Sequence, residues 1–158
     1  MFGGSKHDVC PRASILGDAS QVVLYKSGEG RDVTDITYQG EVTALAGECE
    51  FSSKGKVINM TVTITLVATR GPAASGDSVQ LPFFVSVIDK RQQRVMNKAV
   101  FESPIPFKDN RRRSGVAEQI AETINVEQGR TSADYEILVG LQLNEEQLEF
   151  NRKRRGSQ

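Results

Sequence analysis

The chain has 158 residues, of which 38% are hydrophobic and 25% charged, and this composition fits one folded domain of ordinary size. Its 20 basic and 20 acidic residues cancel, so it lacks the overall positive charge with which nucleic-acid-binding domains hold phosphates, and no apolar run is long enough to span a membrane. With one histidine, two cysteines and no tryptophan, it is also poor in the residues that build metal sites and activated nucleophiles, so we expect no enzyme, cofactor or bound metal.

The polar ends of the sequence predict flexible tails at residues 1–9 and 152–158, and the second tail is basic. Residues 10–151 are expected to form one β-domain. Short apolar segments predict minor strands at 15–25, 49–51, 95–101, 120–126 and 147–151, separated by turn-forming clusters of Gly, Ser, Asp and Pro.

Alternation of polar and apolar residues predicts four longer strands, at 36–44, 59–66, 81–87 and 135–143. Pro82 has no N–H to donate to a neighbouring strand, so we expect it at the start of its strand or at a sheet edge. The inward-facing residues of these strands form the predicted core: Ile36, Tyr38, Val42, Met60, Val62, Ile64, Leu66, Phe83, Val85, Val87, Tyr135, Ile137, Val139 and Leu141.

Two segments have two interpretations each. Residues 115–123 fit either a short helix or an extended strand, and the sequence leaves both open. In residues 144–155, Asn144 could cap a helix whose acidic residues precede its basic ones, but the alternation of Leu148 and Phe150 favours a hairpin with the preceding strand. The expected fold is an all-β antiparallel sandwich of about seven to nine strands, with at most one short helix.

The order of elements in residues 124–139 is a strand, a turn around Gly129 and a strand that opens with Tyr135. This order resembles that of fibronectin-type and other immunoglobulin-like domains. The resemblance implies that the Tyr135 hydroxyl turns back to bond the upstream backbone and pins the crossing between the sheets. The alternative is that Tyr135 is the first inward residue of an ordinary strand.

The opening segments 2–6 and 9–16, together with 134–140 and 150–152, resemble a proteobacterial family of small envelope lipoproteins without an assigned activity. The resemblance implies an export signal and an acylated cysteine upstream of Met1, and membrane contact only through that lipid. Cys10 itself is a poor acylation site because no apolar run precedes it.

Cys10 and Cys49 are the only cysteines, and a bridge between them would close a loop of about 40 residues and stabilise the fold by roughly 4 kcal/mol. We expect this disulfide, and with it an oxidising location in the periplasm or cell envelope. The alternative is two unpaired thiols in a cytosolic protein. A zinc site is not expected, because His7 is the only further soft ligand and lies in the N-terminal tail.

Seven of the twenty basic residues fall into two short runs: Arg111, Arg112 and Arg113, and Arg152, Lys153, Arg154 and Arg155. Such runs predict contact with an anionic partner, such as a lipid head group, an acidic surface polymer or an acidic protein face. The alternative is two solvated charge runs. RNA is disfavoured because no exposed aromatic residues are interleaved with them.

The leading hypothesis is therefore a non-enzymatic cell-envelope binding or assembly module. It would contact a protein partner or an anionic surface polymer through edge strands or the basic loop, as a monomer or weak homo-oligomer, without a specific nucleic-acid partner. One alternative is a small ligand-binding protein or hydrolase that uses loop carboxylates such as Asp32 and Asp35, Tyr25 or Tyr38, and the arginine cluster. Another is a structural subunit whose edge strands pair between copies.

Overall fold

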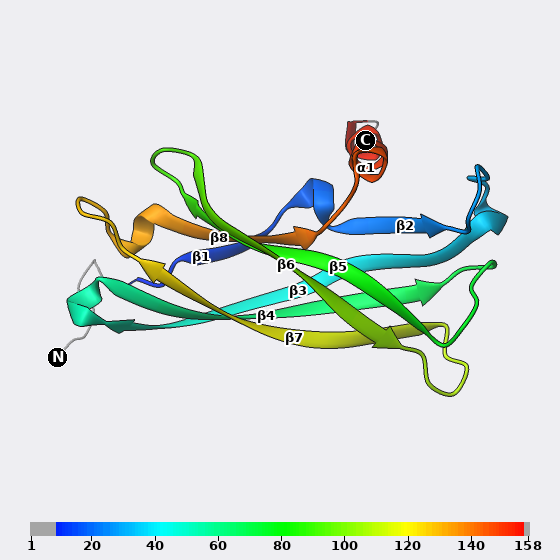
Figure 1. Cartoon of the computed structure of the whole chain (residues 1–158), viewed down its shortest axis with the longest axis horizontal. Coiled ribbons are helices and arrows are strands. Elements are labelled where there is room, and N and C mark those ends of the chain that lie inside the picture. The colour runs from blue at the N-terminus through cyan, green and yellow to red at the C-terminus, as the bar shows by residue number, and fades with distance from the viewer. Residues whose placement is uncertain (1–8, 157–158) are drawn as a thin grey trace.

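The computed structural model describes residues 9–156, so the predicted N-terminal tail, apart from Val9, lies outside the described residues. The protein is an all-β sandwich of two four-stranded sheets, with one α-helix on its outside (Figure 1). In chain order the elements are β1 (Arg12–Ile15), η1 (Gly17–Ala19), β2 (Gln21–Tyr25), η2 (Val33–Asp35), β3 (Ile36–Ser52), η3 (Ser53–Gly55), β4 (Val57–Arg70), β5 (Ser78–Asp89), β6 (Arg94–Pro106), β7 (Arg113–Asn125), η4 (Ser132–Asp134), β8 (Tyr135–Leu141) and α1 (Glu145–Gly156), where η denotes a short 3-10 helix.

The strand order is β1-β8-β5-β6 in one sheet and β2-β3-β4-β7 in the other. The chain crosses from β4 to β5, turns into β6, returns to β7 beside β4 and crosses again to β8 beside β5. This crossing order is that of immunoglobulin-like sandwiches. One pair departs from the antiparallel expectation, because β1 runs parallel to β8.

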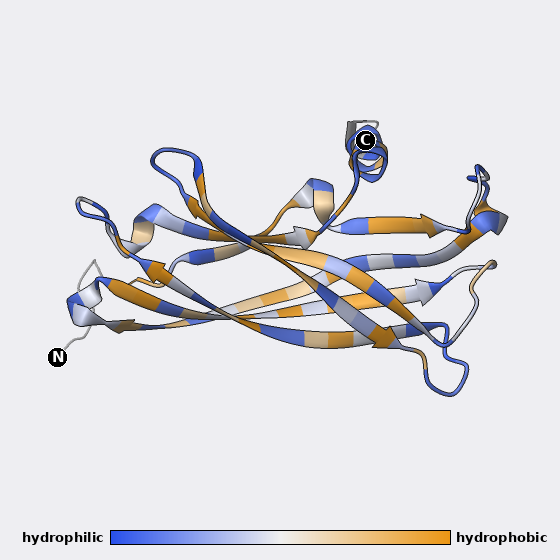
Figure 2. Ribbon diagram, viewed as in Figure 1, coloured by the Kyte–Doolittle hydropathy of each residue, from blue (hydrophilic) through white to orange (hydrophobic). Residues whose placement is uncertain are grey.

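Every residue predicted for the core is buried. The period of two explains this result, since successive side chains of a strand point to opposite faces of its sheet. Polar and apolar bands therefore alternate along the long strands in Figure 2. Ile58 and Ile105 complete the core from strand ends outside the predicted strands, and Ile124 completes it from the minor strand predicted at 120–126.

Residues 115–123, for which a helix was also considered, lie in β7. This strand pairs residue for residue with β4, from Val57 opposite Asn125 to Thr69 opposite Arg113. The pairing satisfies the backbone groups that β7 turns toward β4, whereas a short helix would have left the edge of β4 bare.

The position predicted for Pro82 is wrong, because β5 lies inside its sheet and Pro82 is neither at the strand's start nor at an edge. The Pro82 carbonyl accepts a hydrogen bond from Gln142 N at 2.8 Å, so its nitrogen faces the same side. The ladder with β8 ends one residue earlier, at Phe83 opposite Leu141. The missing N–H therefore falls where no partner strand requires it.

The hairpin predicted for residues 147–151 is also wrong, and so is the start of a flexible tail at Arg152, because α1 runs through both. Asn144 Oδ1 accepts from Gln147 N at 2.8 Å, and Gln147 Oε1 accepts from Asn144 N at 2.9 Å. This reciprocal cap satisfies backbone donors that would otherwise be orphaned. Within residues 9–156, no helix is long and apolar enough to cross a membrane.

Candidate functional site: a basic groove beside the C-terminal helix

Helix α1 lies across the start of β2 and is fixed there by a buried side chain. Asn151 Nδ2 donates to the backbone oxygens of Asp18 at 2.9 Å and of Gln21 at 2.7 Å. The Arg152 guanidinium adds an ion pair to the Asp18 carboxylate at 3.6 Å. The β2 strand forms an edge of its sheet, so these contacts also cap part of that edge.

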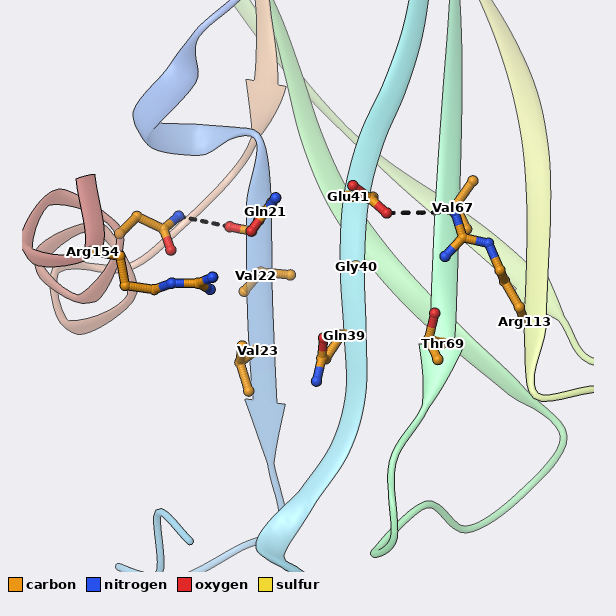
Figure 3. A pocket seen from close by; sticks show the side chains of 11 residues that line it. Gln21, Val22, Val23, Gln39, Gly40, Glu41, Val67, Thr69, Arg113 and Arg154 are labelled. Atoms are coloured by element: carbon orange, nitrogen blue, oxygen red, sulfur yellow. Dashed lines mark hydrogen bonds and ion pairs between the residues drawn. The ribbon is translucent and has the colours of Figure 1, made fainter. Parts of the chain in front are cut away.

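The docked helix turns the outer face of this sheet into a groove of about 130 Å³. Arg113 from β7 stands on one side and Arg154 from α1 on the other, with the outward faces of β2, β3 and β4 between them (Figure 3). We call this depression the basic groove; its lining residues are Gln21, Val22, Val23, Gln39, Gly40, Glu41, Val67, Thr69, Arg113, Asn151 and Arg154. One arginine from each basic run of the sequence therefore lines this groove.

Both arginines of the basic groove are oriented by a neighbour. Arg113 Nη2 lies 3.5 Å from Glu41 Oε1, with 60% of the arginine side chain exposed. The Arg154 guanidinium stacks over the Phe150 ring at 5.7 Å from its centroid. The groove thus combines two guanidinium groups with one carboxylate, two glutamine amides and the Thr69 hydroxyl.

The remaining residues of the two runs do not line the basic groove. Arg111 and Arg112 lie exposed in the loop between β6 and β7, and their side chains have no ion-pair partner among residues 9–156. Lys153 is exposed on α1. Arg155 belongs to α1, and its side chain lies outside the described part of the chain.

A second cleft of about 270 Å³ lies between α1 and β2. Its lining is more apolar and includes Val23, Tyr25 and Phe150. Arg31 closes one side, since its guanidinium stacks on Tyr25 at 5.1 Å and its Nε lies 3.1 Å from Glu146 Oε1. We call it the apolar cleft.

The structural role predicted for Tyr135 is confirmed. Its side chain is fully buried, and its hydroxyl oxygen accepts a hydrogen bond from Glu127 N at 2.9 Å. This bond ties the start of β8 to the backbone just after β7. The residue is therefore the tyrosine corner of an immunoglobulin-like sandwich.

The predicted disulfide is also present. Cys10 and Cys49 are bonded, with their Cα atoms 5.8 Å apart. The bond fastens the segment before β1 to the C-terminal part of β3, across 39 positions of sequence. Such a bond is compatible with an oxidising compartment.

Several of the loop carboxylates and tyrosines considered for an enzymatic site make structural contacts. Asp35 accepts from Asp32 N at 3.0 Å and pairs with Lys26 at 3.2 Å, and these two interactions lower the pKa of its carboxyl. Tyr38 donates from its hydroxyl to the Ser75 carbonyl at 2.7 Å. Among residues 9–156, no three His, Cys, Asp or Glu side chains gather where they could hold a metal.

A buried ionic cluster that no sequence pattern predicted lies at the opposite end from the basic groove. Asp89 is fully buried, and it accepts from the backbone N–H groups of Arg91 at 3.0 Å and Gln92 at 3.2 Å. It also accepts from Arg130 Nε at 3.1 Å. Burial alone would raise the pKa of Asp89, but these hydrogen bonds outweigh it and hold the pKa below its usual value.

The groove residues Gln39, Thr69 and Asn151 were missed as well. Alternation already places Gln39 on the polar face of β3, so its outward direction could be read from the sequence. The residues that surround Gln39 in the groove could not be read from the sequence, because they depend on where α1 docks. The signal for docking is Asn151, a polar residue that is buried because both hydrogen bonds of its amide reach backbone oxygens.

No protein-family model, curated protein or solved structure matches this chain. The fold is therefore established by the arrangement of its own strands, and no family is assigned. What the protein binds has to follow from the chemistry of the basic groove.

Proposed function

We propose that this protein is a non-enzymatic binding module of an oxidising compartment, such as the periplasm, and that it holds an anionic polymer in the basic groove. One observation carries the proposal: Arg113 and Arg154, which come from two basic runs far apart in the sequence, line the same depression. Two runs that are merely solvated have no reason to place one arginine each in the same groove.

The side chains of the basic groove favour an acidic polysaccharide as the polymer. Guanidinium groups bind carboxylates and phosphates with two parallel hydrogen bonds. Gln21, Gln39 and Thr69 supply the amide and hydroxyl groups that bond sugar hydroxyls. The exposed Arg111, Arg112 and Lys153 near the groove add long-range attraction for a polyanion.

The compartment in this proposal rests on the disulfide. Structural disulfides persist where the environment is oxidising and are rare where thiols are kept reduced. The bond between Cys10 and Cys49 therefore supports an extracytoplasmic location. The resemblance of the opening segment to envelope lipoproteins supports the same location.

The test uses oligogalacturonate as a carboxylate polysaccharide and titration calorimetry at two salt concentrations. The double variant Arg113→Ala/Arg154→Ala should bind at least tenfold more weakly and with a smaller dependence on salt, because it lacks the two guanidinium contacts. The control Lys54→Ala/Lys56→Ala removes the same charge at the other end of the sandwich. Equal losses in both variants would contradict the proposal, since net charge rather than the groove would then explain binding.

The apolar cleft supports a second candidate function, that of a carrier for a small apolar molecule with an acidic group. Tyr25 and Phe150 supply apolar surface, and Arg31 a charge at its rim. Fluorescence of 1-anilinonaphthalene-8-sulfonate measures this directly. Enhancement that disappears in Phe150→Ala favours the carrier, whereas no enhancement in the unaltered protein excludes it.

A further inference from the structure

Strand β1 occupies an unusual position in this sandwich. In immunoglobulin-like domains, the strand beside the counterpart of β8 is the last one of the domain and runs antiparallel to it. Here β8 is followed by α1, and β1 from the start of the fold fills that edge in parallel. The edge of β8 is therefore completed by a segment distant in sequence.

The attachment of β1 to this edge is small. The ladder has four residue pairs, from Arg12 opposite Glu136 to Ile15 opposite Val139. Only Ala13 and Ile15 face the core, and both are partly buried. On the outer face, Ser14 Oγ donates to Glu136 Oε2 at 3.3 Å.

Beneath β1 lies an apolar surface that needs a cover. Ile137 and Val139 of β8 are fully buried, and a Cβ on Gly47 of β3 would lie 3.6 Å from the Ala13 Cβ. Without β1, these groups and the backbone edge of β8 would be open to solvent. An exposed strand edge beside an apolar surface is the arrangement that binds an extended segment as an additional strand.

Two devices hold β1 in its own molecule. Before it, the disulfide joins Cys10 to Cys49 of β3. After it, a tight turn leads through η1 to β2, with Ala19 N bonding Leu16 O at 3.0 Å and Ser20 N bonding Gly17 O at 3.3 Å. Opening this turn also breaks bonds to other elements, because Asn151 Nδ2 donates to Asp18 O at 2.9 Å and Val42 N donates to Ser20 O at 2.9 Å. The disulfide adds a covalent restraint to these contacts.

We propose that the β8 edge is a strand-acceptor site whose second occupant is β1 of another copy of this chain, and that closure of the Cys10–Cys49 bond within one molecule blocks the exchange. The β1 strand of a second copy fits this edge as well as the molecule's own β1 does, because it presents the same Ala13 and Ile15 to the same surface. The turn at residues 16–20 serves as the hinge. This site is separate from the basic groove and does not depend on its proposed function.

In the exchanged form, Cys10 of one copy lies beside Cys49 of the other. Oxidised glutathione can join them: the two thiols lose two protons and two electrons to form the intermolecular disulfide, and one glutathione disulfide becomes two glutathione thiols. The same pairing cannot form within a chain that lacks either cysteine. Single-cysteine variants therefore report exchange without competition from the closed monomer.

The test mixes Cys10→Ser with isotope-labelled Cys49→Ser in the presence of oxidised glutathione. We expect the Cys10–Cys49 peptide pair between the two chains to dominate the disulfide-linked dimers, at least tenfold above the Cys10–Cys10 and Cys49–Cys49 pairs, by mass spectrometry of non-reduced digests. Equal yields of all three pairs, or only glutathione adducts of monomers, would overturn the proposal.

Two variants of the Cys10-bearing copy distinguish disulfides formed by strand exchange from disulfides formed by random collision of the two chains. Ile15→Asp places a charge against the apolar acceptor surface, so it should lower the yield of the Cys10–Cys49 pair to that of the Cys10–Cys10 and Cys49–Cys49 pairs. Ser14 faces outward, so Ser14→Ala should leave the yield of the Cys10–Cys49 pair unchanged. Equal effects of the two would contradict exchange.

If Ile15→Asp fails to fold, a synthetic peptide of residues 9–16 replaces the second copy as the source of β1. This peptide should link to Cys49 of the Cys10→Ser variant, and a scrambled peptide should not. If the peptide links but the second copy does not, the edge accepts a strand that another copy cannot deliver, and the proposed occupant is wrong.

Discussion

The end of the sandwich that holds the tyrosine corner and the end that holds the basic groove use charged residues in opposite ways. At the corner, Asp89 is fully buried and the Arg130 side chain is only 13% exposed. At the groove, the Arg113 side chain is 60% exposed, and its partner Glu41 is also partly exposed. Exposed ion pairs add little to stability, so the charges at the groove remain available to a partner while those at the corner maintain the fold.

The largest effect on stability is expected from the disulfide. The variant Cys10→Ser/Cys49→Ser should lose about 4 kcal/mol of unfolding free energy, because the unfolded chain regains the freedom of a loop of about 40 residues. Urea unfolding measures this, and oligogalacturonate binding at folded conditions should stay unchanged. A loss of binding without unfolding would show that the disulfide and the groove are not independent.

Replacing Asp89 with Asn should be the next most damaging change, because it leaves Arg130 without its buried carboxylate. The pKa of Asp89 is lowered in the folded state, so its contribution is present above the unfolded pKa and is lost as pH falls through the folded value. Thermal melts from neutral to acidic pH should therefore fall steeply for the unaltered protein and less steeply for Asp89→Asn. Parallel profiles would contradict the role of this carboxylate.

Tyr135→Phe should cost about 1 kcal/mol, because it leaves the Glu127 N–H without its acceptor. The matched control is Tyr25→Phe at the groove end, where the ring stacks under Arg31 and the change should stay within about 0.5 kcal/mol. Chemical denaturation compares the two. Equal costs would mean that Tyr135 acts through its ring alone and not as a corner.

A smaller effect of opposite sign is expected at Glu122, which is buried on β7 with Asn97 Nδ2 at 3.4 Å. Burial raises its pKa, so its folded form favours the proton and stability declines as pH rises through that pKa. Glu122→Gln removes the charge and should raise the melting temperature at neutral pH. A lower melting temperature would show that the ionised carboxylate stabilises the contact between Asn97 of β6 and Glu122 of β7.

The smallest change is expected for Arg111→Ala/Arg112→Ala. Both side chains are exposed, so the unfolding free energy should move by no more than about 0.5 kcal/mol. The rate of association with oligogalacturonate should fall through lost steering, while the dissociation rate should not change. An accelerated dissociation would place these residues in the bound site itself.

The sequence predicted the core because burial in a sandwich follows the local period of two, as in residues 59–66. Tyr135 and the cysteine pair were predictable for a similar reason, since each depends on a recognisable position along the chain. The helix was only the second interpretation of residues 144–155, because two alternating apolar residues outweighed the cap at Asn144. The groove was missed because it exists only after Asn151 docks α1 on β2, and no local pattern encodes that contact.

The most direct test of the groove is amide chemical-shift mapping by NMR on the isotope-labelled protein during titration with oligogalacturonate. We expect the largest shifts on both sides of the groove together, at Gln39, Thr69 and Arg113 and in α1 around Arg154, with one common binding constant. Shifts confined to the loop of Arg111 and Arg112, with none in α1, would contradict this expectation.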